Sequence, residues 1–285
     1  LQELIDHKYE GPIRCIVRET SDTSMLDNSG LNIEKVYGDL DDGDFLMNAM
    51  RDVDVLLHIA GIQKTLKVIK AATLNNVGQG IFVHTTGIFS KFKSASEEYQ
   101  QIEDEMKRII KTNNKFMSIT IFRPTMIYGD LCDLNMSKFI RMVDYLRVFP
   151  VINKGESLIQ PVNARDLGKA YFQVLNVPKE NLKSEYVVSG DVPITMVSAF
   201  KTISKALGKK TIFISFPLWG GVILARLLYV LTLGRIDYIE KVQRMGEDRS
   251  FPHDDATNDF SYLPRSFDKG IKVEVEQYMN KKRGK

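Results

Sequence analysis

Val53-Asp-Val-Leu-Leu-His-Ile59 is a short apolar run in which branched residues dominate. Residues 66–74 follow with helical spacing, and a second apolar run, Ile81-Phe-Val-His84, comes next. Strands of four to seven apolar residues that alternate with longer helices are typical of a parallel sheet covered on both faces. This segment therefore predicts two parallel strands joined by a crossover helix.

The same alternation extends to both sides of this unit. Upstream are the apolar runs Ile13-Arg-Cys-Ile-Val17 and Glu34-Lys-Val-Tyr37, and downstream are a helix over about 96–111 and a strand over 119–122. Right-handed crossovers between such units give a doubly wound sheet, whose ligands lie at the carboxyl ends of the strands. The predicted fold class is therefore α/β with a doubly wound parallel sheet.

The pattern changes after Gly129. We expect helices over residues 136–147, 164–176, 195–207 and 266–279, strands over 158–162, 185–188 and 211–214, and a polar loop over 251–264. These elements are expected to form a smaller, substrate-facing lobe at the carboxyl edge of the sheet. The predicted division is a domain over residues 1–130 and a lobe over residues 131–285 that is interleaved with it.

The composition is that of an ordinary soluble globular protein. Of 285 residues, 44% are hydrophobic and 26% are charged, and 39 basic residues nearly balance 36 acidic ones, which gives a net charge of +3. This balance argues against a nucleic-acid partner. Cys15 and Cys132 form no close pair, so neither a disulfide framework nor a metal site is predicted, and a reducing cytoplasm is the expected location.

One apolar stretch, over residues 216–233, requires a test for membrane insertion. It falls short of the ~20 apolar residues that span a bilayer, and Pro217, two glycines and Arg226 interrupt it. We predict a buried helix of the C-terminal lobe, with a membrane-surface helix as the alternative.

Several short motifs follow one another in order along nearly the whole chain. They are His58-Ile-Ala-Gly61, Val83-His-Thr-Thr-Gly-Ile-Phe89, Tyr99-Gln-Gln-Ile-Glu103, Arg123-Pro-Thr-Met-Ile-Tyr-Gly129 and Asp259-Phe-Ser-Tyr-Leu-Pro264. This ordered set resembles the extended short-chain dehydrogenase/reductase family, which includes nucleotide-sugar epimerases and dehydratases. The resemblance implies a Rossmann-like domain that binds NAD or NADP.

Three residues are implied on the adenosine side of that cofactor. Arg18 closes a strand where the family reads the ribose, and an arginine there suits a 2′-phosphate, so the resemblance favours NADP over NAD. A solvated loop arginine is the alternative. Asp39 and Leu40 resemble the family's adenine-contacting pair, and a turn role competes for Asp39.

The resemblance places further cofactor contacts after two of the predicted strands. Small residues at such positions let the backbone approach the cofactor. The implied contacts are Ile59, Ala60 and Gly61 after the first strand, and Pro124, Thr125, Met126 and Ile127 beside the nicotinamide.

Three polar residues are implied as catalytic. By the resemblance Thr85, with Thr86 as the neighbouring candidate, binds a substrate oxygen, and Tyr99 acts as acid or base. In the family a Lys four residues after the Tyr stabilises its phenolate, whereas this chain has Glu103 there. Glu103 either forms a surface ion pair with Lys107 or lies in the pocket, where it acts as a base or leaves Tyr99 inert.

The Gly-rich turn with which this family begins does not occur in the chain. Residues 1–6 resemble the end of the helix that follows that turn. The sequence is therefore expected to be a fragment, or else the protein has dispensed with dinucleotide binding.

Two functions follow from these features. The leading prediction is an NAD(P)-dependent oxidoreductase, epimerase or dehydratase-like enzyme that acts on a carbonyl or nucleotide-sugar substrate. The alternative is a non-catalytic NAD(P)-binding regulatory or accessory protein, which Glu103 favours. The expected partners are a dinucleotide and a small-molecule substrate, with a second copy of the chain as a further candidate.

Overall fold

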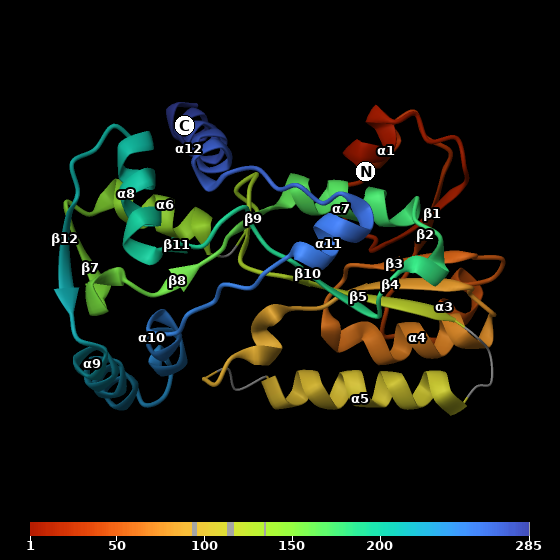
Figure 1. Ribbon diagram of the computed structural model, residues 1–285, viewed down its shortest axis with the longest axis horizontal. Helices are drawn as coiled ribbons and strands as arrows, with labels where there is room; N and C mark the ends of the chain where they lie inside the picture. The colour runs from red at the N-terminus through yellow and green to blue at the C-terminus, as the bar shows by residue number, and fades with distance from the viewer. Residues whose placement is uncertain (93–95, 113–116, 134, 285) are drawn as a thin grey trace.

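The computed structural model describes residues 1–92, 96–112, 117–133 and 135–284 (Figure 1). At its centre is a four-stranded parallel sheet in the order β10-β5-β4-β3. These strands are β3 (Val55–His58), β4 (Gln79–Val83), β5 (Ser118–Pro124) and β10 (Glu185–Val188). Strand β10 comes from the second half of the chain, which therefore contributes to the sheet of the first half.

Helices cover both faces of this sheet (Figure 1). Successive residues of β4 point to opposite faces, and both Ile81 and Phe82 are fully buried. Phe82 packs with α3 (Gly43–Ala49), α4 (Thr65–Leu74) and α5 (Ser96–Thr112), whereas Ile81 packs with α7 (Ala164–Leu175) and α11 (Asp254–Phe260). The predicted doubly wound α/β fold is therefore confirmed.

The first two strands form a separate parallel pair. β1 (Ile13–Val17) pairs with β2 (Ile33–Tyr37), and among the described residues neither pairs with β3. Arg14 ties this pair to the end of α3, because its Nη1 donates to the carbonyls of Ala49 and Arg51 over 3.1 and 2.6 Å. The chain thus enters the fold with two strands that lie beside the central sheet without a hydrogen bond to β3.

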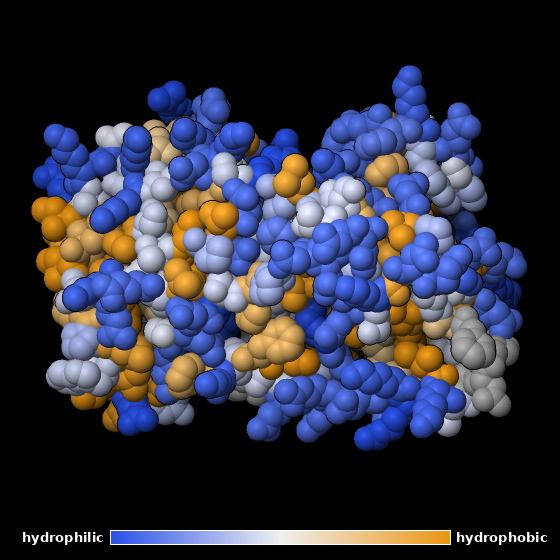
Figure 2. All heavy atoms as spheres, viewed as in Figure 1, coloured by the Kyte–Doolittle hydropathy of each residue, from blue (hydrophilic) through white to orange (hydrophobic). Residues whose placement is uncertain are grey.

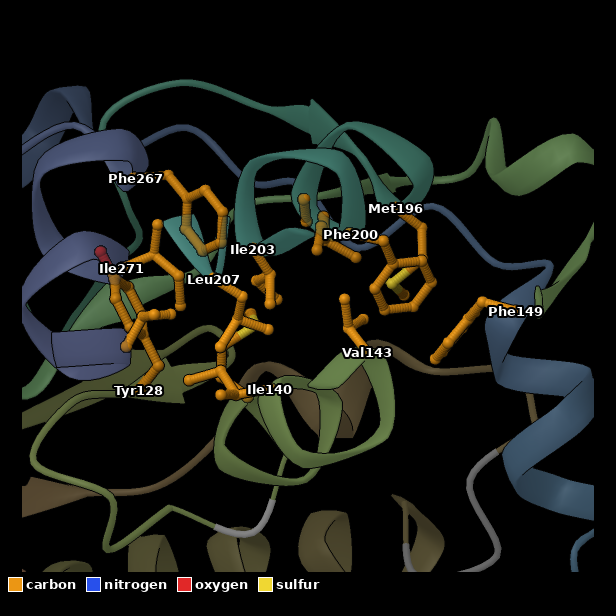
Figure 3. Packing of buried hydrophobic residues seen from close by; sticks show 14 of the residues in the cluster. Tyr128, Ile140, Val143, Phe149, Met196, Phe200, Ile203, Leu207, Phe267 and Ile271 are labelled. Carbon is orange, nitrogen blue, oxygen red and sulfur yellow. The ribbon is translucent and has the colours of Figure 1, made fainter. Parts of the chain in front are cut away.

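A second apolar core lies beside the sheet (Figure 3). It is built from α6 (Met136–Tyr145), β7 (Val148–Ile152), α8 (Met196–Ala206), β12 (Ile212–Phe216) and α12 (Phe267–Arg283). β7 and β12 form a parallel pair, and Phe149 packs against Phe200 with ring centroids 4.6 Å apart. The sequence did not predict β7, because its Pro150 reads as a strand breaker.

The remaining elements lie around these cores. They are α1 (Gln2–Asp6), α2 (Ser24–Asp27), η1 (Ile62–Lys64), η2 (Thr86–Phe89), β6 (Ile127–Tyr128), η3 (Asn153–Gly155), β8 (Leu158–Ile159), β9 (Val162–Asn163), η4 (Lys179–Asn181), β11 (Ile194–Thr195), α9 (Leu218–Leu231) and α10 (Ile239–Met245). Two predictions were wrong here. The single strand expected over 158–162 is two strands broken at Pro161, and the loop expected over 251–264 contains α11.

The prediction that the apolar stretch is a buried helix is also wrong. It forms β12 and α9, but of the residues in α9 only Ala225 is buried, and Trp219 is 70% exposed. The other residues of the helix are half-buried or exposed, so its apolar character did not lead to full burial. No described helix is both long and apolar enough to cross a membrane.

Candidate functional site

The candidate site lies where β4 and β5 end side by side. Val83 pairs with Phe122, and the His84 N–H donates to the Phe122 carbonyl over 2.8 Å. Two residues further on, Thr86 Oγ1 donates to the Pro124 carbonyl over 3.2 Å. The turn after β4 is therefore adjacent to the end of β5.

The two candidate threonines in that turn have different bonding. Thr85 caps η2, and its Oγ1 accepts from the Gly87 N–H over 2.9 Å. Thr86 donates its hydroxyl proton to Pro124 and so fastens the turn to β5. In the described part of the chain Thr85 accepts a hydrogen bond but donates none, which leaves its O–H available to a substrate oxygen. The geometry thus favours Thr85 over Thr86.

Tyr99 lies on α5 against the same turn. It is buried, 8% exposed, and packs with Ile62, Ile88 and Ile102. Ile88 belongs to η2, whose cap is Thr85. The helix that carries Tyr99 is therefore fixed directly onto the turn that carries Thr85.

Glu103, one helical turn after Tyr99, is buried in a network of polar groups. Its carboxylate binds the Arg123 guanidinium in a bidentate ion pair of 2.6 and 2.8 Å. His84 Nδ1 lies 2.8 Å from Glu103 Oε1, and His84 Nε2 lies 3.1 Å from Thr65 Oγ1. Burial alone would raise the pKa of Glu103, but the hydrogen bonds from Arg123 and His84 lower it to about 2.

This network excludes two of the roles considered for Glu103. Glu103 does not form the surface ion pair with Lys107. Glu103 is buried, whereas the Lys107 side chain is exposed and its Nζ lies 4.0 Å from Asp104 Oδ1. A carboxylate with a pKa near 2 that is held by a guanidinium is also too weak a base for proton abstraction near neutral pH. Glu103 is therefore a buried ion-pair partner that positions α5 on β4 and β5.

The end of β3 presents an exposed backbone edge. Ile59 and Ala60 are exposed, and Gly61 has φ = 99°, a conformation that favours glycine. His58 is buried, its Nε2 lies 3.1 Å from the Gly61 carbonyl, and burial lowers its pKa to about 4. His58 therefore braces this turn as a neutral side chain, and Ile59, Ala60 and Gly61 offer backbone that a ligand can approach closely.

The adenosine-side candidates lie at the ends of β1 and β2. Arg18 is exposed, and its backbone closes a turn with Ser21. Asp39 Oδ1 accepts from the Asp41 N–H over 2.9 Å, so its carboxylate serves a turn. Leu40 packs against the core on the α3, α4 and α5 side of the sheet. Asp39 thus takes part in a turn, and Leu40 packs against the core.

The four candidates from Pro124 to Ile127 lie at the end of β5 and directly after it, and they have different contacts. The Thr125 hydroxyl donates to the Gln160 carbonyl, and the Met126 carbonyl accepts from the Val162 N–H over 3.0 Å. These contacts join the first half of the chain to the second. Pro124 is buried beside the Thr86 hydroxyl, and Ile127 is exposed.

A cavity of about 430 Å³ opens beside η2. One wall is the turn from Thr86 to Phe92, and the other carries Arg244, Arg249 and Phe251. Glu247 holds the walls together, because its carboxylate accepts from the Ser90 hydroxyl over 2.6 Å and from the Lys91 N–H over 2.9 Å. The ring centroids of Phe89 and Phe251 are 5.5 Å apart.

Two guanidinium groups on this cavity carry polar atoms without partners. The Nε atoms of Arg244 and Arg249 are buried and have no hydrogen-bond partner among the described residues. Burial, and then the charge of Arg244, lowers the pKa of Arg249 to about 10. An anionic group in the cavity would supply the missing acceptors.

The sequence interpretation did not identify Arg123, His84 or Glu247 as residues of the site. Arg123 carried a usable signal, since a charged residue inside an otherwise apolar strand requires a buried partner. His84 and Glu247 carried none, because their partners lie 19 and 157 residues away. Asp166, in the first turn of α7, accepts from Arg265 Nε over 2.9 Å and so connects this helix to the segment before α12.

A nicotinamide dinucleotide fits part of this arrangement. The exposed edge at Ala60 and Gly61, and the donor at Thr85, suit the nicotinamide end. The described residues contain no Gly-rich turn that opens a helix, so they supply no cradle for the pyrophosphate. The residues present therefore fit one end of such a cofactor.

Comparison with solved structures finds the same fold over nearly the whole chain. The crystal structure of gox2253 matches with a TM-score of 0.76 at 18% identity, covering 99% of this chain and 94% of that one. The dTDP-glucose 4,6-dehydratase DesIV from Streptomyces venezuelae, solved with NAD bound, matches with a TM-score of 0.71 at 18% identity over 99% and 93%. UDP-glucose 4-epimerase from Thermotoga maritima matches with a TM-score of 0.70 at 12% identity over 98% and 94%. No family model and no curated protein sequence matches the chain.

Proposed function

We propose that this protein is an extended short-chain dehydrogenase/reductase-like enzyme that binds a nicotinamide dinucleotide. Its substrate is a small molecule with a carbonyl or carbinol group, of the nucleotide-sugar type. The proposal is supported above all by the contacts of the η2 turn, which Thr85 caps: Thr86 bonds this turn to Pro124 at the end of β5, and Ile88 packs it against Tyr99. The solved structures that share the fold include proteins with NAD bound, which supports the cofactor class.

Thr85 and Tyr99 have distinct roles in this proposal. The cofactor, when bound, supplies or accepts a hydride. Thr85 donates its free O–H to the substrate oxygen and so orients it, and the Tyr99 hydroxyl completes the binding of that oxygen. Because Glu103 is already paired with Arg123, no charge from that position stabilises a Tyr99 phenolate. Turnover is therefore expected to be slow.

The cavity beside η2 is the proposed substrate pocket. Its unpaired guanidinium atoms on Arg244 and Arg249 suit a phosphate or diphosphate, and the Phe89 and Phe251 rings suit a flat apolar group. Together these walls favour an anionic substrate over a neutral carbonyl compound.

The second candidate is a dinucleotide-binding protein without turnover. The observation that favours it is the Glu103–Arg123 pair, which occupies the place where the resembling family has its Lys. In this case the same strand ends bind the cofactor. A shift of the η2 turn on binding is then transmitted to the second half of the chain through the Ser90–Glu247 hydrogen bond.

Titration of the purified protein with NADH and NADPH, followed by nicotinamide fluorescence, tests both candidates. The proposal expects saturable binding and slow turnover on a panel of nucleotide sugars and carbonyl compounds. Thr85→Ala and Tyr99→Phe should each reduce kcat by about 10²-fold or more while dinucleotide affinity is retained. Tyr145→Phe, at a residue that is 90% exposed, is the matched control. Binding without turnover would favour the second candidate, and no binding of either dinucleotide would contradict both.

A further inference from the structure

Large apolar side chains are exposed on β12 and α9, which lie at one end of the molecule (Figure 1). In Figure 2 this end shows orange side chains among blue ones. Among these apolar side chains are Ile212, Ile214, Phe216, Trp219, Leu224 and Leu231. We call this set the α9 surface. Soluble proteins rarely expose so many adjacent large apolar side chains without a partner.

The helix at the centre of this surface is apolar on all sides. Its inner side packs through Gly221, where a Cβ atom would lie 2.8 Å from Ile152 and 3.0 Å from Val242. The other sides carry no compensating polar stripe, and Arg226 is the only charged residue between Leu218 and Leu231. A helix that is hydrophobic all round is normally buried in a large core or in a membrane. Here one side packs against Ile152 and Val242, and the rest of the helix faces outward.

Strand β12 extends the same surface. Along the strand, Phe213 points into the core and packs near Phe149, whereas Ile212 and Ile214 point outward. Pro217 then leads directly from β12 into α9. Two consecutive elements thus expose large apolar side chains, which is more than a single poorly packed helix would expose.

The chain segment that contains the α9 surface is basic. From Lys205 to Arg244, both included, it has seven Lys and Arg residues and two Asp and Glu residues. Lys209 pairs with Asp144 and Arg244 with Glu240. Arg226 and Arg235 are exposed on and just after the helix. Lys241 Nζ lies 4.9 Å from the Tyr238 ring centroid, so an aromatic and a cation occur together there. Exposed Trp and Tyr with flanking Lys and Arg suit the boundary between anionic headgroups and acyl chains.

We propose that the α9 surface docks on an anionic lipid bilayer, with α9 lying in the plane of the membrane. The helix has 14 residues and is therefore about 21 Å long, which is short of the ~30 Å hydrocarbon core. The protein then attaches to one leaflet without crossing it. A second copy of the chain is the less suitable occupant, because a two-fold contact would bring the basic flanks of both copies together.

Trp219 provides a direct test, because it is the only tryptophan of the chain. The purified protein is mixed with phosphatidylcholine vesicles that contain phosphatidylglycerol, and the Trp219 emission is recorded. We expect a blue shift, quenching by brominated acyl chains, co-flotation with the vesicles, and weaker binding at high salt. An unchanged emission in the presence of vesicles would overturn the proposal. Equal binding to vesicles of phosphatidylcholine alone would overturn the assignment to an anionic surface.

Variants of exposed leucines test whether vesicle binding depends on the α9 surface or on exposed apolar side chains in general. Leu224→Glu with Leu231→Glu should weaken vesicle binding roughly ten-fold or more, because two side chains that would enter the membrane become charged. Leu74→Glu is the matched control, since Leu74 is 60% exposed on α4, whereas Leu224 is 67% exposed. Sedimentation without lipid detects the alternative. A dimer that the double variant converts to a monomer, with no vesicle binding by either form, would show that a second copy covers the surface.

Discussion

Glu103 and Arg123 face each other in a buried bidentate ion pair that joins α5 to the end of β5. Both side chains are 5% exposed, and the two N–O distances are 2.6 and 2.8 Å. Arg123 also reaches Glu185 on β10 over 2.8 Å, so one guanidinium connects a helix and two strands. The position one turn after Tyr99 is therefore committed to structure.

Replacing Glu103 by Gln should destabilise the protein strongly. The change leaves the buried guanidinium with the partly exposed Glu185 carboxylate as its remaining charge partner, and breaking such a buried pair typically costs about 3–5 kcal/mol. Urea unfolding, followed by circular dichroism, measures the loss. Glu105→Gln on the same helix is the control, because Glu105 pairs with Arg108 on the surface and such pairs contribute roughly 0–1 kcal/mol. Equal stabilities of the two variants would contradict this account of the ion pair.

The same pair predicts a specific loss of stability in acid. The pKa of Glu103 is about 2 in the folded protein and 4.5 as the ordinary value, since Arg123 and His84 outweigh the burial that would raise it. A carboxyl with a lowered folded pKa stabilises the fold above the unfolded pKa, and this contribution is lost as the pH falls from about 4.5 towards 2. The linked change is on the order of 3 kcal/mol. The difference in unfolding free energy between wild type and Glu103→Gln should therefore shrink over that interval, and a constant difference would be the contrary result.

The sequence revealed the order of strands and helices because their signals are local. Strand runs and helical spacing lie within ten to twenty residues, so β3, α4 and β4 were predicted close to their observed bounds. The Glu103 contacts could not be predicted in the same way. Local spacing suggested Lys107 as the partner, but the actual partner lies 20 residues away on an adjacent strand. The sequence showed that α9 is apolar. It could not show whether α9 is buried, because burial depends on whether another element covers the helix.

Arg249 gives a prediction about the cavity beside η2. Its Nε is buried without a hydrogen-bond partner, and burial together with Arg244 lowers its pKa to about 10. Arg249→Met removes an unsatisfied cation, so we expect the thermal midpoint to be unchanged or raised. Pyrophosphate should raise the midpoint of the wild type but not that of the variant. Arg165→Met, which removes an exposed guanidinium, should retain the response and serves as the control. An unaltered pyrophosphate effect in Arg249→Met would contradict an anion site here.

Glu274 on α12 should make the stability of the protein depend on pH in the opposite direction from Glu103. Its carboxyl is buried, and burial, then the hydrogen bond and the charge of the nearby Asp133, raise its pKa to about 8. A carboxyl with a raised folded pKa costs no stability below the unfolded pKa near 4.5, but the cost grows as the pH rises towards 8.

Glu274→Gln should therefore stabilise the protein at pH 8 by an amount on the order of a few kcal/mol, and by much less at pH 4.5. Urea unfolding at the two values measures the change. Glu276→Gln, at an exposed residue of the same helix, is the control. A Glu274→Gln variant that is less stable than wild type at both values would show that the ionised carboxylate has a favourable partner.

Gly270 allows α12 to approach β6 closely. A Cβ atom at this position would lie 2.0 Å from the hydroxyl oxygen and 2.9 Å from Cζ of Tyr128, a side chain that is fully buried and cannot move aside. Gly270→Ala should therefore cost about 1–3 kcal/mol through overpacking, despite the better helix propensity of alanine. Gly168→Ala on α7 is the matched change, because nothing lies within 4 Å of its added Cβ atom. There the gain in helix propensity should stabilise the protein by up to about 1 kcal/mol. The midpoint of thermal unfolding should fall in Gly270→Ala and rise in Gly168→Ala. A shift of the same sign in the two variants would contradict the close contact between α12 and Tyr128.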